Sequence, residues 1–336
     1  MRSMKQQKRI LLALAMACCF TANAQSKAGI TDKPDTSYTN FSAYNSIRKD
    51  YPGAKLVNEK ALKSVKQKND ITYCSTGERK LLLDVFYPSA KSKQKRVGVL
   101  IIHGGGWRTG NRTQHHALAQ RLADLGYVCF TPEYRLSTEA LYPAAVHDLK
   151  AALRWIHAHA KKYKIDTGQI AVLGFSAGGQ LAALLGTTMG NKTFEGTGCY
   201  ATYSSDVQAI IDLDGTLSFV HPESGEGDDS KRTSAATYWF GYSKRENLKL
   251  WQEASPLAHV SKSTPPTLFI NSSVARMHAG RDDYMKVLKE NAIYTDVKTF
   301  DGAPHHFPFF DPWFEPMLTY VDEFLKKIFG FKENRQ

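Results

Sequence analysis

The stretch AVLGFSAGGQLA, residues 171–182, places a single serine between two glycines directly after an apolar run. The apolar run predicts a buried strand, and the Ala/Leu-rich residues after Ser176 predict a helix. Gly-x-Ser-x-Gly between a strand and a helix is typical of a sharp turn that exposes the serine hydroxyl. Larger side chains at Gly174 or Gly178 would collide with a neighbouring strand or helix, and amides at the helix start stabilise negative charge. The pattern therefore indicates that Ser176 is a nucleophile.

A second glycine-rich stretch, His-Gly-Gly-Gly-Trp at residues 103–107, follows the continuous apolar run 97–102. Three adjacent glycines lose much conformational entropy on folding, which is tolerated where the backbone must approach another group closely. Acyl transfer passes through an oxyanion that backbone amides can stabilise. We expect the donors to be the amides of Gly105, Gly106 and Ala177. Trp107 is an alternative source of a donating amide, and its ring is expected to form the floor of the substrate pocket.

A histidine near the C-terminus completes the pattern. The stretch GAPHHF, residues 302–307, follows the last predicted strand. Sites of this type have the chain order serine, acid, histidine. His305 is therefore the expected general base, and His306 is the alternative one residue away.

From residue 71 onward, predicted strands alternate with predicted helices, which is typical of an α/β protein with helices covering a mostly parallel sheet. Two strands at 71–74 and 81–87, separated by a short turn, predict an antiparallel hairpin at one edge of this sheet. The other predicted strands are 97–102, 127–131, 169–173, 207–213, 267–271 and 295–300.

The organisation along the chain follows from this reading. We expect a catalytic domain over residues 71–336, preceded by a polar, Lys-rich N-terminal extension at 25–70. An irregular segment at about 215–264 is too long for a simple connection, so we expect an insertion that shapes a binding surface.

The first 24 residues have the pattern of a cleaved secretory signal. Four basic residues precede an apolar run at 10–20, and Ala-Asn-Ala stands before Gln25. Cleavage near Ala24 would release the protein to the periplasm or the exterior. Neither this run nor any later one is long enough for a transmembrane helix, so we expect no transmembrane segment.

Removing residues 1–24 takes away four of the 44 Lys and Arg residues and none of the 32 Asp and Glu residues, which leaves a formal charge of +8. A positive field attracts polyanions. Nucleic acid is not expected as a partner, because the exported chain has no recognisable recognition module. Of the three cysteines that remain, Cys74, Cys129 and Cys199, at most one internal pair can form, and Cys129 is expected to be a small buried hydrophobe.

Six stretches carry a family resemblance that runs from about residue 71 to the C-terminus: LDVFYP, HGGGW, EYRLSTEALYPAAVHDLKAALRWI, IAVLGFSAGGQLAALLG, ASPLAHVSKSTPPTLFI and GAPHHF. In this order they resemble the α/β-hydrolase fold carbohydrate esterases of Bacteroidetes-type bacteria. That group is related to acetylxylan and feruloyl esterases and to pectin acetyl- and methylesterases. The resemblance implies that Ser176 attacks an ester, that His305 transfers the proton and that water releases the acyl-enzyme. It implies no metal and no cofactor.

The third catalytic group departs from the pattern of this family. Its acid usually follows the strand predicted at 267–271, but residues 272–281, SSVARMHAGR, contain no carboxylate. The remaining candidates are Asp212, Asp214, Asp282 and Asp283. We expect Asp214 to be the acid because the carboxyl end of its strand faces the site, and we expect Asp212 to be held structurally. A neutral group that orients His305 is a further alternative, because the acid mainly fixes the tautomer of the imidazole.

Basic residues stand where the acid is missing. Arg276, His278 and Arg281 occupy a loop that borders the catalytic histidine in this fold. Guanidinium groups match carboxylates in geometry, so together with the net charge these residues favour a uronic-acid polymer over neutral xylan. We expect an acidic polysaccharide or oligosaccharide substrate, most specifically methyl-esterified pectin, with Trp107 and Arg108 completing the binding set.

Three other interpretations remain open at this point. The protein could be an acetylesterase acting on pectin or xylan, or a non-catalytic carbohydrate-binding protein of the same fold. The arginines could also serve structure alone, paired with Asp282, Asp283 or Asp301.

Overall fold

The computed structural model of the chain describes residues 25–330. The predicted signal segment, residues 1–24, therefore lies outside the described residues. At the centre of the fold is an eight-stranded sheet in the order β2-β3-β5-β4-β6-β7-β8-β9. The strands are β2 (Val65–Thr76), β3 (Arg79–Pro88), β4 (Arg96–Ile102), β5 (Val128–Pro132), β6 (Ile165–Phe175), β7 (Ala209–Leu213), β8 (Thr267–Asn271) and β9 (Thr295–Thr299).

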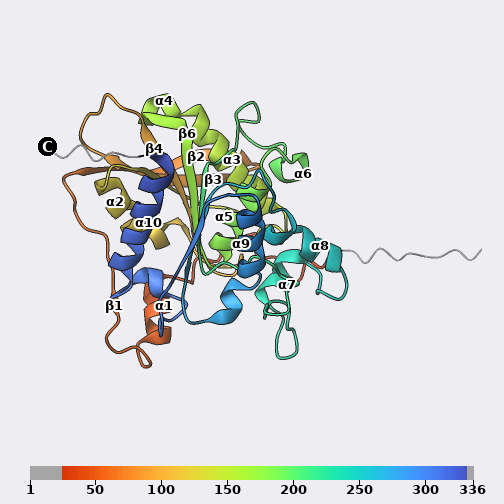
Figure 1. The fold of residues 1–336 in the computed structure, drawn as a ribbon. Coiled ribbons are helices and arrows are strands. Elements are labelled where there is room, and N and C mark those ends of the chain that lie inside the picture. The colour runs from red at the N-terminus through yellow and green to blue at the C-terminus, as the bar shows by residue number, and fades with distance from the viewer. Residues whose placement is uncertain (1–24, 331–336) are drawn as a thin grey trace, which may run out of the picture.

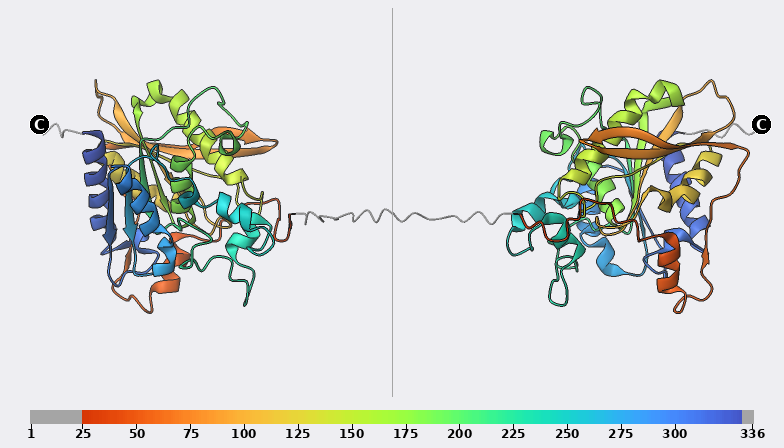
Figure 2. Two further views of the ribbon diagram at one scale, coloured as in Figure 1. Left: turned by 45° about the vertical axis from the view of Figure 1, so that its right-hand side comes forward. Right: turned by 180° about the vertical axis from the view of Figure 1, so that it is seen from behind.

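The sheet is antiparallel at one edge and parallel through the rest. β3 pairs antiparallel with both β2 and β5, whereas the strands from β5 to β9 in the sheet order are parallel. This confirms the predicted α/β class with a hairpin at one edge. β2 begins earlier than predicted, at Val65, because its first residues pair with the end of β3. Both views in Figure 2 show this long β2–β3 ribbon, in orange, running across the top of the molecule.

Helices cover both faces of the sheet (Figure 1). The first face carries α3 (Ala144–Ala158), α5 (Ala177–Thr187) and α9 (Arg281–Glu290), and the second carries α2 (His116–Asp124) and α10 (Phe314–Phe329). Side chains alternate along β4, so Leu100 and Ile102 pack under the first layer and Val99 and Ile101 under the second. An uninterrupted apolar run is thereby buried on both sides. Among residues 25–330, no helix is both long and apolar enough to cross a membrane.

Residues 25–64, the greater part of the predicted N-terminal extension, are attached to the body of the fold. They include α1 (Asn40–Ile47) and β1 (Lys55–Leu56), which pairs with β10 (Phe310–Asp311). Further upstream, Asp35 forms a bridge with Thr109, and Gly110 donates its backbone N–H to the Asp35 carbonyl over 2.9 Å. The segment therefore lies against the loop that follows β4.

The irregular region at 215–264 contains α7 (Ala235–Phe240), α8 (Leu248–Glu253) and the short helix η2 (Pro256–Ala258). α7 and α8 lie side by side at the right of Figure 1. Aromatic rings anchor the region: Phe219, Phe240 and Trp251 pack with ring centroids 4.5 to 5.9 Å apart. The region is thus a packed part of the fold, although it has few regular elements.

One disulfide joins distant parts of the chain. Cys74, near the end of β2, is bonded to Cys199 in the loop before β7, 125 residues away. Cys129 is free and buried in β5. This confirms the expectation of at most one internal pair and of a buried Cys129.

Candidate active site

Ser176 occupies a strained turn between β6 and α5. Its backbone angles are φ 56° and ψ −121°, in the left-handed half of φ space that side chains avoid. A Cβ at Gly174 would lie 1.9 Å from the Gly178 carbonyl oxygen, and a Cβ at Gly178 would lie 2.2 Å from the Ile102 carbonyl oxygen. The Ser176 amide donates to the Leu213 carbonyl over 2.8 Å, which ties the turn to the end of β7. The two glycines are therefore required sterically, as the sequence predicts.

His305 follows β9 and lies between Ser176 and Asp214. Its Nε2 is 2.9 Å from the Ser176 Oγ, and its Nδ1 is 2.9 Å from the Asp214 Oδ2. A carboxylate accepts, so Nδ1 carries the ring proton and Nε2 is left to accept from the serine hydroxyl. The ring also packs on Phe175, with centroids 4.8 Å apart. The structure thus brings these three predicted residues into one chain of hydrogen bonds.

The neighbouring His306 is placed differently. Its ring lies 6.0 Å from that of Tyr38, and it forms no side-chain hydrogen bond within residues 25–330. Burial lowers the pKa of His306 to about 4. The structure therefore separates the two alternatives for the base, because only His305 contacts Ser176.

Asp214 is fully buried, with φ 54°, in the turn after β7. Its Oδ1 accepts the Ser272 backbone N–H over 2.8 Å, and its Oδ2 accepts the Ser272 hydroxyl as well as His305. Ser272 stands directly after β8, where the resembled family usually has its acid. Here Ser272 at that position donates hydrogen bonds to Asp214, whose carboxylate follows the neighbouring strand β7. Sequence reasoning missed Ser272, although the absence of an acid at that position was the available signal.

The other candidate acids do not reach His305. Asp212 Oδ1 accepts the Gly215 amide over 2.7 Å, and its Oδ2 is buried without a hydrogen-bond partner in the described structure. Burial raises the pKa of the Asp212 carboxyl well above its usual value, and the nearby Asp214 adds to this rise. Asp282 is exposed and pairs with Arg281, and Asp283 pairs with His221.

The glycine loop after β4 lies directly against the nucleophile turn. A Cβ at Gly104 would be 3.1 Å from the Ser176 Cβ. Gly105 has φ 122°, and a Cβ there would meet the Thr109 carbonyl oxygen at 2.0 Å, so only glycine fits. Within residues 25–330, the expected donor amides of Gly105, Gly106 and Ala177, and the alternative at Trp107, have no protein acceptor. These N–H groups are therefore available to a ligand.

The Trp107 ring differs from its predicted role. Only 4% of the residue is exposed, and the ring is stacked on Trp239 with centroids 5.0 Å apart. Its indole N–H donates to the Gln180 Oε1 over 2.8 Å. The ring therefore fixes the glycine loop to α5 and α7 from inside the fold, and it does not form an open pocket floor.

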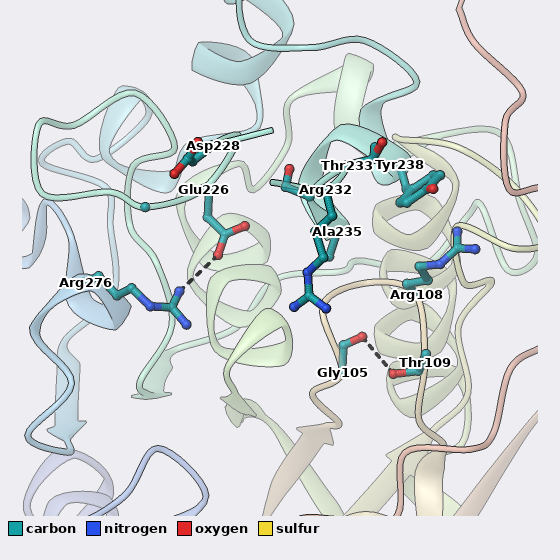
Figure 3. Close-up of a pocket in the computed structure, with 12 residues that line it drawn as sticks. Gly105, Arg108, Thr109, Glu226, Asp228, Arg232, Thr233, Ala235, Tyr238 and Arg276 are labelled. Atoms are coloured by element: carbon teal, nitrogen blue, oxygen red, sulfur yellow. Dashed lines mark hydrogen bonds and ion pairs between the residues drawn. The ribbon is translucent and has the colours of Figure 1, made fainter. Parts of the chain in front are cut away.

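A cavity of about 770 Å³ begins at Gly105 and extends along the insertion. Its charged lining consists of Arg108, Arg232, Arg276, Glu226 and Asp228. Figure 3 shows that these side chains come from separate segments: the glycine loop, the insertion and the loop after β8. Three guanidinium groups thus line a cavity that includes Gly105 of the glycine loop, although neither Ser176 nor His305 lines it.

The three arginines of the cavity have different partners. The Arg276 Nη1 lies 3.6 Å from the Glu226 Oε1, and Arg108 stacks 4.2 Å above the Tyr238 ring. Arg232 forms no ion pair or side-chain hydrogen bond within residues 25–330. Burial raises the pKa of Glu226, against the opposing influence of Arg276, Lys244 and His305.

Arg232, Glu226 and Tyr238 were not among the residues predicted to bind substrate. The signal for them was the insertion itself, which the sequence identified only as a binding surface. Its length gave no means of choosing among its polar residues.

Arg281 and His278 do not line this cavity. Arg281 donates to the Asn271 Oδ1 over 2.8 Å and pairs with Asp282. His278 is half-buried, and burial lowers its pKa, with a further contribution from Arg281. Arg281 thus pairs with Asp282, which is the structural alternative given for these basic residues in the sequence analysis. Arg276 is the member of this basic loop that reaches the cavity.

No group of three or more His, Cys, Asp or Glu side chains within residues 25–330 could hold a metal ion.

The chain that carries this fold, the glycine loop and the Ser176–His305–Asp214 geometry has counterparts among known proteins. A family profile described as BD-FAE matches residues 83–277. The chain belongs to the BD-FAE family.

Among its relatives is a probable carboxylic ester hydrolase of Mycobacterium tuberculosis, LipM, which is 30% identical over 203 residues, 58% of this chain and 46% of the relative. The chain spans about half the length of the curated relatives it matches first.

Two solved structures share the α/β-hydrolase fold. A truncated carbohydrate esterase from gut microbiota aligns with TM-score 0.65 and 23% identity, over 81% of this chain and 100% of that one. A bifunctional GH43-CE protein of Bacteroides eggerthii aligns with TM-score 0.66 and 26% identity, over 78% of this chain and 38% of that one.

Proposed function

We propose that this BD-FAE protein is a serine carboxylic-ester hydrolase that acts on an esterified acidic polysaccharide of the plant cell wall, most specifically as a pectin methylesterase. The observation that carries the proposal is the hydrogen-bond chain from Asp214 through His305 to Ser176. Such a chain, in a nucleophile turn beside unpaired backbone amides, supplies every group that acyl transfer requires.

The proposed reaction uses these groups in two steps. The His305 Nε2 takes the Ser176 proton as the Oγ attacks the ester carbonyl carbon, and the amides of the glycine loop and of Ala177 stabilise the oxyanion. His305 then gives the proton to the departing alcohol, and an acyl-enzyme remains. Water, deprotonated by His305, attacks the acyl carbon and releases the acid and Ser176. Asp214 keeps the ring in one tautomer and stabilises the imidazolium.

The cavity supports an acidic substrate. Arg108, Arg232 and Arg276 surround a space that is also lined by Gly105 of the glycine loop. Guanidinium groups bind carboxylates through paired, charge-assisted hydrogen bonds. In a partly methylated pectin, free carboxylates neighbour the esterified galacturonate, and these neighbours would occupy the cavity. The carbohydrate esterase from gut microbiota and the bifunctional GH43-CE protein that share this fold are consistent with a carbohydrate substrate.

We further propose that the protein acts after export, with residues 1–24 as its signal peptide. The disulfide between Cys74 and Cys199 supports this proposal because such bonds persist in oxidising compartments. The insertion at about 215–264 is proposed to be the part of the catalytic domain that recognises the polymer.

The decisive experiment measures methanol and acetate released from native pectin by the exported protein and by Ser176→Ala. Methanol release should fall by at least about 10³-fold in the variant. Acetate as the sole product would overturn the methylesterase proposal. The absence of both products would overturn pectin as the substrate, and hydrolysis of p-nitrophenyl acetate would then show whether any esterase activity exists.

Replacement of Arg276 tests the acidic substrate. Arg276→Ala should reduce pectin turnover by roughly 10- to 100-fold, because it removes a charge-assisted hydrogen bond. Its activity on p-nitrophenyl acetate, which has no carboxylate, should stay close to that of the wild type. Equal losses on both substrates would contradict recognition of a uronate by this side chain.

A further inference from the structure

A strongly basic surface lies at the opposite end of the sheet from Ser176. Two shallow hollows of about 190 and 320 Å³ meet at Lys164. Eight cations line them: Lys66, Lys91, Lys93, Lys95, Arg96, Lys161, Lys162 and Lys164. They come from the start of β2, the loop before β4 and the segment before β6, so they surround the amino ends of parallel strands whose carboxyl ends carry the catalytic residues. We call these eight residues the basic surface.

The positive charge of the basic surface is not neutralised. None of its members forms an ion pair within residues 25–330, and no Asp or Glu lines either hollow. The Arg96 Nη2 donates to the Ala90 carbonyl over 2.7 Å, and the Lys164 ammonium donates to the Ser92 carbonyl. Burial lowers the pKa of Arg96. Neutral carbonyls therefore position two of the cations, and the positive potential is left for a partner from outside.

We infer that the basic surface binds the free carboxylates of an acidic polysaccharide chain at a site separate from the catalytic cavity. This inference rests on the proposed function for the choice of polymer. The mature chain carries a formal +8, equal in size to the charge of these eight residues. Part of the excess positive charge noted in the sequence is thus concentrated on this surface.

The occupant should be a polymer because the surface is broad and its contacts are individually weak. Seven of the eight cations are exposed lysines, and an exposed ion pair contributes at most about 1 kcal/mol. A small anion would meet only one or two of them. A polyuronate presents a carboxylate on every sugar, so many weak contacts add together. Holding the polymer there raises the local concentration of esters at the catalytic end.

The test uses the chain without residues 1–24, carrying Ser176→Ala so that no ester is hydrolysed, and unesterified polygalacturonate as the probe. Lys91, Lys93, Lys95 and Lys162 are changed together to Gln, and the dissociation constant is measured at low and at physiological salt. Affinity should fall roughly 10- to 30-fold at low salt, and the difference should shrink as salt rises.

A matched control removes the same charge elsewhere. Lys49, Lys192, Lys286 and Lys289 are exposed and lie outside both hollows and outside the insertion. Changing these four to Gln should leave affinity within about twofold of the parent, because net charge alone acts weakly through screening salt. An equal loss in the control, or no loss in the basic-surface variant, would overturn the inference.

Two further arms separate this inference from its alternatives. With Ser176 intact, the basic-surface variant should hydrolyse p-nitrophenyl acetate at the wild-type rate, which shows that it is folded. If the protein releases nothing from pectin but the variant still loses polygalacturonate binding, the proposed function fails and the basic surface stands. Binding to phosphatidylglycerol vesicles with no binding to polygalacturonate would overturn the inference in favour of an anionic membrane.

Discussion

The two ends of the parallel sheet hold their charges in opposite ways. At the carboxyl ends, Asp214 and His305 are joined to each other and to Ser176 by hydrogen bonds of 2.9 Å. At the amino ends, the members of the basic surface have no ionic partner within residues 25–330. A charge with a close partner has a fixed position and a short range. A charge without one has a longer range and a loose position.

The difference teaches how one sheet can serve two requirements. Bond making needs reacting atoms held within a few tenths of an ångström, which buried and fully bonded side chains provide. Attraction of a long polymer needs positive charge that neighbours do not cancel. The arginine cavity lies between these extremes, because Arg276 is paired whereas Arg232 has no ionic partner in the part of the chain that the structure describes. Substitutions at the carboxyl end should therefore affect every ester, and those in the cavity only acidic ones.

The largest effect is expected at the carboxyl end of the sheet, where Asp212 in β7 can be compared with Asp214 in the turn that follows it. Asp214→Asn should reduce kcat by about 10⁴-fold on all esters, because an amide does not hold the ring in the required tautomer or stabilise the imidazolium. Asp212→Asn should stay within a few-fold of the wild type. The amide keeps the acceptor for the Gly215 N–H, and burial raises the pKa of the Asp212 carboxyl and so disfavours the negative charge that the substitution removes.

Steady-state kinetics on p-nitrophenyl acetate and pectin check this pair. A wild-type rate for Asp214→Asn would reject its assignment as the acid. A loss for Asp212→Asn as large as that for Asp214→Asn would show that a negative charge at position 212 is needed.

Loss of the side-chain hydrogen bond from Ser272 to Asp214 should have a smaller effect on activity than loss of the Asp214 carboxylate itself. Ser272→Ala removes the hydroxyl that donates to the Asp214 Oδ2 but keeps the backbone N–H to Oδ1. Hydrogen bonds to charged groups contribute about 1.5–3 kcal/mol, so kcat/KM should fall roughly 10- to 100-fold on both substrates. Ser273→Ala is the control, because its hydroxyl bonds Phe300 and Gly302 and does not contact Asp214. Equal losses in both variants would mean that loop order, and not the acid, is affected.

The cavity should show an effect limited to acidic substrates. Arg232→Gln should raise KM for pectin roughly tenfold, because it removes the cavity arginine that has no partner within the described residues. Its kinetics on p-nitrophenyl acetate should not change. Arg245→Gln is the matched control, since Arg245 is an exposed arginine of the same insertion outside this cavity. A similar rise in KM for Arg245→Gln would indicate a general charge effect.

Two buried histidines near the catalytic end should make the stability of the fold depend on pH. Burial lowers the pKa of His103 to about 4 and that of His115 to about 3. An unfolded histidine titrates near 6.5, so between pH 6.5 and these values the unfolded chain binds more protons. The contribution of each neutral, buried histidine to the free energy of unfolding is therefore fully present above pH 6.5. As the pH falls below 6.5, the free energy of unfolding decreases by about 1.4 kcal/mol per pH unit for each histidine.

Replacement of His115 tests this dependence. Both ring nitrogens of His115 are buried without a hydrogen-bond partner in the described structure. His115→Leu should make the decline in unfolding free energy between pH 6.5 and 4.5 less steep, as measured by urea denaturation. An unchanged slope would show that the ring gains a proton in the folded protein as readily as in the unfolded chain.

Much of the fold could be predicted because its signals are local. Continuous apolar runs predicted the inner strands, and the glycines around Ser176 followed from the space available at a sharp turn. The start of β2 was predicted too late, since Val65–Lys68 are mostly polar and exposed and are ordered by pairing with β3. Strand pairing of this kind involves partners that a local pattern does not contain.

The site was less predictable where it depends on which strand ends meet. The sequence left Asp212, Asp214, Asp282 and Asp283 as candidate acids and favoured Asp214 for its place at the carboxyl end of a strand, but no local pattern fixes which carboxylate lies against His305. Arg276 and Arg281 are five positions apart, yet one lines the cavity and the other bonds Asn271. The direction of a side chain in an irregular loop depends on the whole surrounding fold.

The sequence by itself determined the α/β class, the strained turn at Ser176 and the glycine loop, because sterics and burial constrain each of them over a few neighbouring residues. Only the tertiary structure decided that Asp214, supported by Ser272, faces His305, and that Arg232 and Glu226 share a cavity with Arg276. These arrangements join atoms from distant parts of the chain. Their energies depend on distances that exist only once the sheet has formed.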